Sequence, residues 1–136
     1  MTHVRAWRWL AVLLLLATRS AHGDEVSPVE VQQMTARFVL AAGANDGGHD
    51  RTLLRYAVSD AENFADVMVQ MGGVEEANRQ MLTDPDIAGF EAALDELSRR
   101  VQAARQTRAR TEVMLYYSGH ADEDGLLLGE QRLGYR

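Results

Sequence analysis

Residues 111–124 read TEVMLYYSGHADED, and the pattern of this stretch decides the expected fold. The apolar run from Val113 to Tyr117 is rich in β-branched and aromatic residues, which predicts a buried β-strand. Ser118 and Gly119 end that strand, and His120 follows directly. Ligands of open α/β sheets bind at the carboxyl ends of the strands, and imidazole exchanges protons near neutral pH. His120 is therefore the first candidate for a functional residue, against the plain alternative of a hydrogen-bonded turn residue.

Strand and helix patterns alternate in the rest of the chain. The predicted elements are a strand over 37–43, a helix over 53–71, a strand over 78–82, a helix over 86–106 and a small hairpin over 125–134. The first helix has apolar residues at three- and four-residue steps: Ala57, Ala61, Phe64, Ala65, Met68 and Met71. The second has a similar stripe: Ile87, Phe90, Leu94, Leu97 and Val101. This alternation predicts an α/β fold with parallel strands and helices packed on the sheet.

Three blocks of the sequence resemble one peptidase family. The heptapeptide YYSGHAD at residues 116–122 resembles the histidine motif of the caspase-like cysteine peptidases, with Ala121 where a glycine is usual. Residues 37–43 look like the first strand of that family, and residues 54–61 look like the start of its first helix. The resemblance implies a three-layer α/β/α domain with a mainly parallel sheet, of which only the first half is present.

The resemblance also implies roles for individual residues. His120 would be the general acid/base of a Cys–His dyad, and the backbone N–H groups of Gly119 or Ala121 would stabilise the oxyanion. The glycine-rich loop after the first strand lacks the pattern of a phosphate loop. Its residues would help to shape the pocket for the substrate residue before the cut. The candidates are Asn45, Asp46, Arg51 and, with less support, His49, each against the alternative of a solvated turn.

The nucleophile of such a peptidase is missing from the chain, which contains no cysteine. In caspases the histidine precedes the cysteine by about 50 residues, but only 16 residues follow His120. The favoured expectation is that the chain is the front part of a larger cysteine endopeptidase. The alternative is an inactive caspase-like interaction module or remnant. Serine and zinc hydrolases are excluded, because the chain has no Gly-x-Ser-x-Gly elbow and no recognised zinc spacing.

The first 23 residues have the pattern of a secretory signal peptide. Arg5 and Arg8 precede a short apolar run over 9–17, and small residues at Ala21 and Gly23 fit a cleavage site. The run is shorter than the roughly 20 residues of a membrane-spanning helix. We therefore expect an exported protein, periplasmic or extracellular, with a signal peptide over 1–23, a leader over 24–36 and a truncated caspase-like domain over 37–136.

The charge of the chain bears on its partners. The net charge of −6 becomes −9 after cleavage, because the signal segment carries three arginines and no acid. An acidic surface argues against nucleic acid and anionic membranes as partners, so the expected partner is a polypeptide substrate. No cofactor is predicted. The acidic run over 122–124 could bind calcium, but it has no defined loop pattern, and a solvated charge run is favoured.

Overall fold

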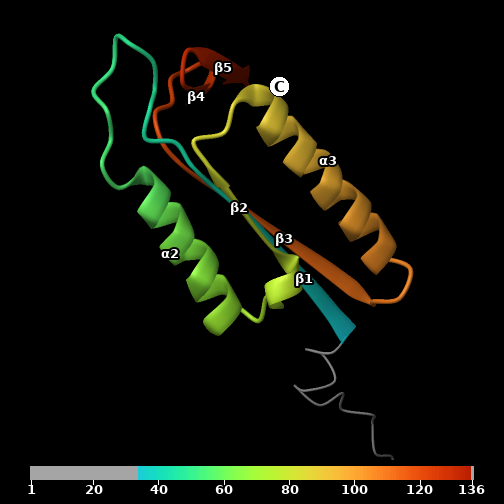
Figure 1. Cartoon of the computed structure of the whole chain (residues 1–136). Helices are drawn as coiled ribbons and strands as arrows, with labels where there is room; N and C mark the ends of the chain where they lie inside the picture. The colour runs from blue at the N-terminus through green and yellow to red at the C-terminus, as the bar shows by residue number, and fades with distance from the viewer. Residues whose placement is uncertain (1–33, 136) are drawn as a thin grey trace, which may run out of the picture.

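The computed structural model describes residues 34–135 and contains a sheet of three parallel strands (Figure 1). The strands are β1 (Thr35–Gly43), β2 (Arg79–Thr83) and β3 (Arg110–Ser118), in the order β2-β1-β3. β1 lies in the centre and pairs in parallel with both neighbours. Val39 and Leu40 of β1 are 0% and 1% exposed, so the middle of this strand is the centre of the core.

Two helices cover opposite faces of the sheet (Figure 1). Ala61 and Ala65 of α2 (Ala57–Gln70) pack on Ala41 of β1. On the other face, Leu97 of α3 (Ile87–Ala104) packs against Leu40. A short 3₁₀ turn, η1 (Glu76–Asn78), precedes β2. The three layers confirm the predicted α/β class with a mainly parallel sheet.

A small hairpin follows the sheet. Its strands are β4 (Gly125–Leu128) and β5 (Gln131–Gly134), paired antiparallel as predicted. Gly129 in the connecting turn has a φ of 57°, which glycine adopts without steric cost. Leu128 is 2% exposed and belongs to the same core cluster as Ala42 and Phe90, so the hairpin is fastened to the sheet by burial of apolar surface.

The ends of α2 differ from the prediction. The helix begins at Ala57, not at Leu53, because the preceding residues form a loop that bonds to the end of β1. The backbone N–H of Leu54 donates to the carbonyl of Asn45 over 2.8 Å. Met71, predicted to lie on the buried face, is the residue that caps the helix and is 84% exposed. The three residues of this helix that are fully buried are alanines: Ala57, Ala61 and Ala65.

β3 is not buried on both faces, which corrects the expectation of a buried strand. Val113 and Leu115 are 45% and 63% exposed, whereas their register partners Phe38 and Leu40 on β1 are 3% and 1% exposed. The α3-side clusters of the core contain residues of β1 and β2 beside α3, and Val113 and Leu115 are absent from them. Among residues 34–135, β3 pairs with β1 alone, so its outer edge is open.

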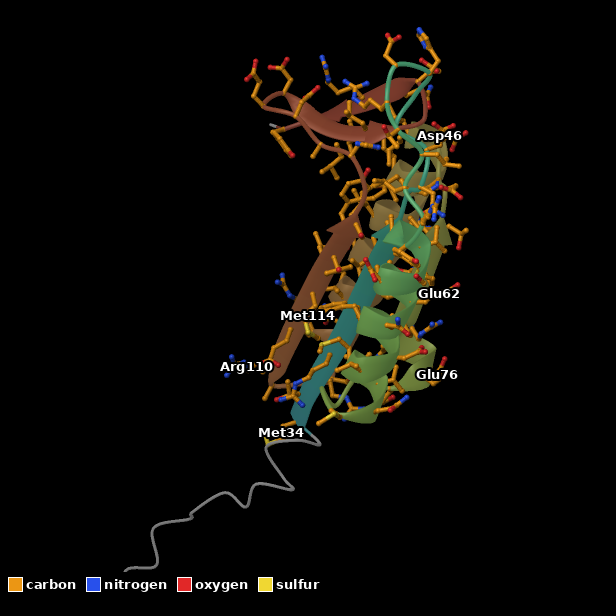
Figure 2. The ribbon with its side chains drawn as sticks, turned by 90° about the vertical axis from the view of Figure 1, so that its left-hand side faces the viewer. Met34, Asp46, Glu62, Glu76, Arg110 and Met114 are labelled. Atoms are coloured by element: carbon orange, nitrogen blue, oxygen red, sulfur yellow. The ribbon has the colours of Figure 1, made fainter. Side chains whose placement is uncertain are left out.

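The register brings the carboxyl ends of all three strands to one edge. Gly43 of β1 lies opposite Thr83 of β2 and Ser118 of β3. Gly43 also lies against the start of α2, because a Cβ there would be 2.4 Å from the Cα of Val58. Figure 2 shows Asp46 at this end of the molecule, with Met34 and Arg110 at the opposite end. The loop over 44–56 and the segment after Ser118 therefore start side by side.

Some predictions fall wholly or partly outside the described residues. The signal peptide and most of the leader, residues 1–33, lie there. β1 begins at Thr35, two residues before the predicted start of the first strand. Within residues 34–135, no helix has the length and apolar character required to cross a membrane.

Candidate active site

His120 lies at the carboxyl edge of the sheet, two residues after the end of β3. Its ring nitrogen Nε2 is 2.8 Å from the carbonyl oxygen of Thr52. A carbonyl oxygen can only accept a hydrogen bond, so the hydrogen of the neutral ring is on Nε2. Nδ1 is then the nitrogen that can accept or release a proton. This tautomer and orientation are what a histidine needs in order to exchange a proton with a neighbouring nucleophile.

The loop over 44–56 also contacts the ring directly. A Cβ at Gly47 would lie 2.2 Å from Cδ2 of His120, so this position has no room for a side chain. Arg51 donates from its guanidinium to the carbonyl of Gly47 over 3.1 Å. Gly47 and Thr52 therefore hold the imidazole between two points of one loop, and Arg51 supports the bend between them.

The backbone around His120 is tied to β4. The N–H of Leu127 donates to the carbonyl of His120 over 2.9 Å, and the N–H of Asp122 donates to the carbonyl of Gly125 over 3.0 Å. These two bonds flank the antiparallel bridge between Ala121 and Leu126. In such a pair, the bridged residues do not use their own N–H groups in the ladder. The N–H of Ala121 is therefore outside the ladder. Ala121 and Gly119 remain the two alternatives for the predicted oxyanion donor.

Arg51 is the pocket candidate that lies near the histidine segment. Its guanidinium is 3.9 Å from the carboxylate of Asp122 and bonds to Gly47, which touches the His120 ring. The side chain is 39% exposed, so the guanidinium remains accessible from solvent.

Asn45 and Asp46 instead hold the loop in shape. The side-chain oxygen of Asn45 accepts from the N–H of Val58 at the start of α2 over 3.3 Å. The carboxylate of Asp46 accepts from the N–H of Gly48 over 2.9 Å. Asp46 also lines a cavity of about 160 Å³ together with Asp84, on the β2 side of the edge.

The second histidine, His49, has a different setting. Its Nδ1 lies 3.0 Å from the carboxylate of Glu130, and its backbone N–H donates to the same group over 2.7 Å. The side-chain hydrogen bond from His49, followed by the backbone one, lowers the pKa of Glu130. The imidazole is 77% exposed and lies 3.2 Å from Asp50. His49 thus fastens the loop to the β4–β5 turn.

The acidic run after His120 forms a turn and ion pairs. Asp122 accepts hydrogen bonds from the N–H groups of Asp124 and Gly125 over 3.0 and 3.1 Å, and Arg132 donates to it over 2.6 Å. Burial by itself would raise the pKa of Asp122, but these bonds outweigh it and lower the pKa. No group of three or more potential metal ligands occurs within residues 34–135.

The sequence pointed to His120 as a candidate but not to the groups that contact its ring. Thr52 acts through its backbone carbonyl, which leaves no signature in the residue type. Gly47 is one of two adjacent glycines, and the doublet indicates a loop without showing which position needs the missing side chain. Glu130 is separated from its partner His49 by 81 residues, so only the folded chain brings them together.

Comparison with known protein families identifies the family of this chain. The sequence matches the family described as "Caspase domain" over residues 36–133, which is most of the chain. Searches of curated proteins and of solved structures found no match. The chain contains no cysteine, so the nucleophile of a cysteine peptidase is absent from it. The match over residues 36–133 shows the family, and the layered α/β fold agrees with it. This chain belongs to the caspase-domain family.

Proposed function

We propose that His120 is the general acid/base of a Cys–His dyad in an endopeptidase, with a thiol supplied from outside these 136 residues. The observation that carries this proposal is the 2.8 Å contact between Nε2 and the Thr52 carbonyl. This partner is uncharged and belongs to the backbone, so it orients the ring without occupying Nδ1. A free Nδ1 on a fixed ring is what a neighbouring thiol requires.

The reaction then follows the ordinary course of acyl transfer. Nδ1 takes the thiol proton, and the sulfur forms a bond to the carbonyl carbon of the substrate while the carbonyl π electrons move to oxygen. N–H groups beside His120, from Gly119 or Ala121, donate to that oxyanion. Collapse breaks the C–N bond, and the leaving amine receives the proton from Nδ1. Water next gives a proton to Nδ1 and displaces the sulfur, which recovers that proton as the acid leaves.

The substrate of this reaction is a polypeptide, and Arg51 is the best-supported contact for the residue before the cut. Its guanidinium is partly exposed and is linked to the loop that holds His120. Asn45 and Asp46 would contribute to the pocket indirectly. Their side chains accept hydrogen bonds from backbone N–H groups and thereby hold the conformation of the loop that lines it.

We also propose export through residues 1–23 as a signal peptide, with a leader to residue 36 and a caspase-like domain from residue 37. The support is the sequence pattern: basic residues, a short apolar run and small residues at the cleavage site. Expression in a secreting bacterium should yield an exported product that begins at Asp24. An uncleaved product retained in the cell would contradict this proposal.

A second candidate function is binding without catalysis. It is favoured by the absence of cysteine and by the uncovered strand β3, where Val113 and Leu115 are exposed. A caspase-like module of this kind would associate with another polypeptide and would not cleave it.

The two functions make different predictions for the source locus. Translation of the three frames downstream of codon 136 should reveal an Asp-x-Cys-like segment about 50 residues after His120 if the peptidase proposal is correct. A stop with no such segment in any frame would favour the binding module.

Peptide cleavage provides the direct test in a product that carries both residues. His120→Ala should lower turnover by about 10²- to 10⁴-fold, the usual contribution of a general acid/base. The matched control is His49→Ala, which removes the other imidazole of the same edge and should leave most of the activity. Retained turnover in the His120 variant would overturn the assignment.

A further inference from the structure

The phenol of Tyr117, near the end of β3, lies beneath the backbone of His120. Its hydroxyl is 3.0 Å from the carbonyl oxygen of His120 and 2.7 Å from the carbonyl oxygen of Leu127 on β4. The ring is half-buried and packs with Ala42 and Leu128. Tyr117 therefore connects the histidine segment, the sheet and the hairpin through one side chain.

The carbonyl of His120 receives hydrogen bonds from two directions. One donor is the N–H of Leu127 at 2.9 Å, and the other is the Tyr117 hydroxyl. The hydroxyl has a single hydrogen and lies within hydrogen-bonding distance of two carbonyl oxygens that can only accept, so this hydrogen bridges the carbonyls of His120 and Leu127. The bridge resists rotation of the peptide group that follows His120.

Gly119 is required by this arrangement. A Cβ at residue 119 would lie 2.3 Å from the Tyr117 hydroxyl oxygen, so only glycine leaves space for the phenol. The Tyr-Ser-Gly-His order thus has a physical reason. The Tyr117 side chain packs against the backbone of Gly119, and its hydroxyl bonds to the carbonyl oxygen of His120.

We propose that Tyr117 is a positioning residue that fixes the backbone of His120 and thereby the orientation of its imidazole. The Thr52 carbonyl holds the ring at Nε2, and the Tyr117 hydroxyl holds the main chain at the other end of the side chain. A side chain held at both ends keeps one rotamer and one tautomer. The catalytic meaning of this positioning rests on the proposed function of His120.

Proton transfer by the phenol itself is a different role, and the environment opposes it. Burial, with a smaller contribution from Tyr135, raises the pKa of Tyr117 to about 12. The hydroxyl therefore keeps its hydrogen at neutral pH and acts as a donor.

The test compares Tyr117→Phe with Tyr116→Phe in the whole 136-residue chain. Tyr116 is the matched control, because it is the neighbouring tyrosine but stacks on Phe64 on the opposite face of the sheet, with ring centroids 4.2 Å apart. Nitrogen-15 NMR at about pH 8, above the ordinary pKa of imidazole, reports the tautomer of His120. Amide exchange reports the bond from Leu127.

In the unsubstituted chain and in the control, we expect the hydrogen of His120 on Nε2 and slow exchange at Leu127. In Tyr117→Phe, exchange at Leu127 should be about 2- to 13-fold faster, which corresponds to the loss of one ordinary hydrogen bond. The preference for the Nε2–H tautomer should fall at the same time. Gly119→Ala, which crowds the hydroxyl, should reproduce both changes by an independent route.

Two results would overturn the proposal: an unchanged tautomer and exchange rate in Tyr117→Phe, or equal changes in Tyr116→Phe. The proposed function fails separately, if the unsubstituted chain shows no preference for hydrogen on Nε2. If, in addition, amide exchange at Leu127 is faster only in Tyr117→Phe, the Tyr117 hydroxyl holds the backbone of His120 but does not position a catalytic ring. This result too would contradict the positioning role.

Discussion

The carboxyl end of β3 and its middle differ sharply although they belong to one strand. At the carboxyl end, the loop over 44–56 and the hairpin enclose Tyr117 and His120 with hydrogen bonds from three directions. In the middle, Val113 and Leu115 are exposed, and no strand of the described part of the chain pairs with the outer edge. Contacts within the described residues thus hold the histidine in place, whereas the flank of the strand that carries it is exposed.

The largest expected effect is a difference in stability loss between two leucines that are partners in the sheet register. Leu40 on β1 is 1% exposed and Leu115 on β3 is 63% exposed. Leu40→Ala should lower the free energy of unfolding by about 2–5 kcal/mol, because it leaves a cavity. Leu115→Ala should change it by no more than about 0.5 kcal/mol. Urea denaturation of the whole chain measures both, and equal losses would contradict the contrast between the strands.

A second prediction concerns the packing of the histidine ring at the enclosed end. Gly47→Ala should push the imidazole away from the Thr52 carbonyl, because the new Cβ would lie 2.2 Å from Cδ2. In a cysteine-bearing product, turnover should fall about 100-fold, the usual cost of misplacing a reacting group by 1 Å. Gly134→Ala is the control, since its Cβ would meet the nearest atom at 3.7 Å. Full turnover in the Gly47 variant would show that Gly47 does not constrain the ring.

A third prediction addresses the open middle of the strand. An unpaired edge beside exposed apolar side chains promotes association of chains, so the 136-residue chain should be marginally stable and should associate as its concentration rises. Leu115→Gln should weaken that association, and Met71→Gln, which changes an exposed residue at the end of α2, should not. Sedimentation velocity measures the effect. A chain that stays monomeric as its concentration rises would contradict the prediction.

The smallest expected effect is the pH dependence of folding stability, which two carboxylates near opposite ends of β3 produce. The hydrogen bond from Arg37, at 2.6 Å, lowers the pKa of Glu112, and the pKa of Asp122 is lowered as well. The unfolded chain therefore takes up protons before the folded one does. The stabilisation is complete above the ordinary carboxylate pKa of about 4 and is lost as the pH falls through the lower folded values.

Urea midpoints measured from about pH 6 to about pH 3 should fall, and Glu112→Gln should reduce the slope. Both carboxylates are near the surface, so added salt should weaken the dependence. A midpoint that is independent of pH over this range would show that the two ion pairs do not contribute to stability.

Local signals in the sequence predicted several features correctly. Asp86, where the sequence predicted the start of this helix, caps α3 with its carboxylate on the N–H of Gly89 at 2.7 Å. Helical periodicity identified the alanine face of α2, but it extended that helix four residues too far, because the loop over 53–56 has the same apolar spacing. Its backbone is held instead by the hydrogen bond from the N–H of Leu54 to the carbonyl of Asn45, which no local pattern reveals.

The order of strands and helices, the resemblance to the caspase family and the place of His120 at the end of a strand could all be predicted from the amino-acid sequence. These properties depend on residue type and spacing along the chain, which periodicity and short motifs record directly. The contacts of Thr52, Gly47 and Tyr117 with that histidine could not be predicted in this way, nor could the exposure of Leu115 beside the buried Leu40. Such contacts join backbone atoms and distant segments, so they exist only once the chain has folded.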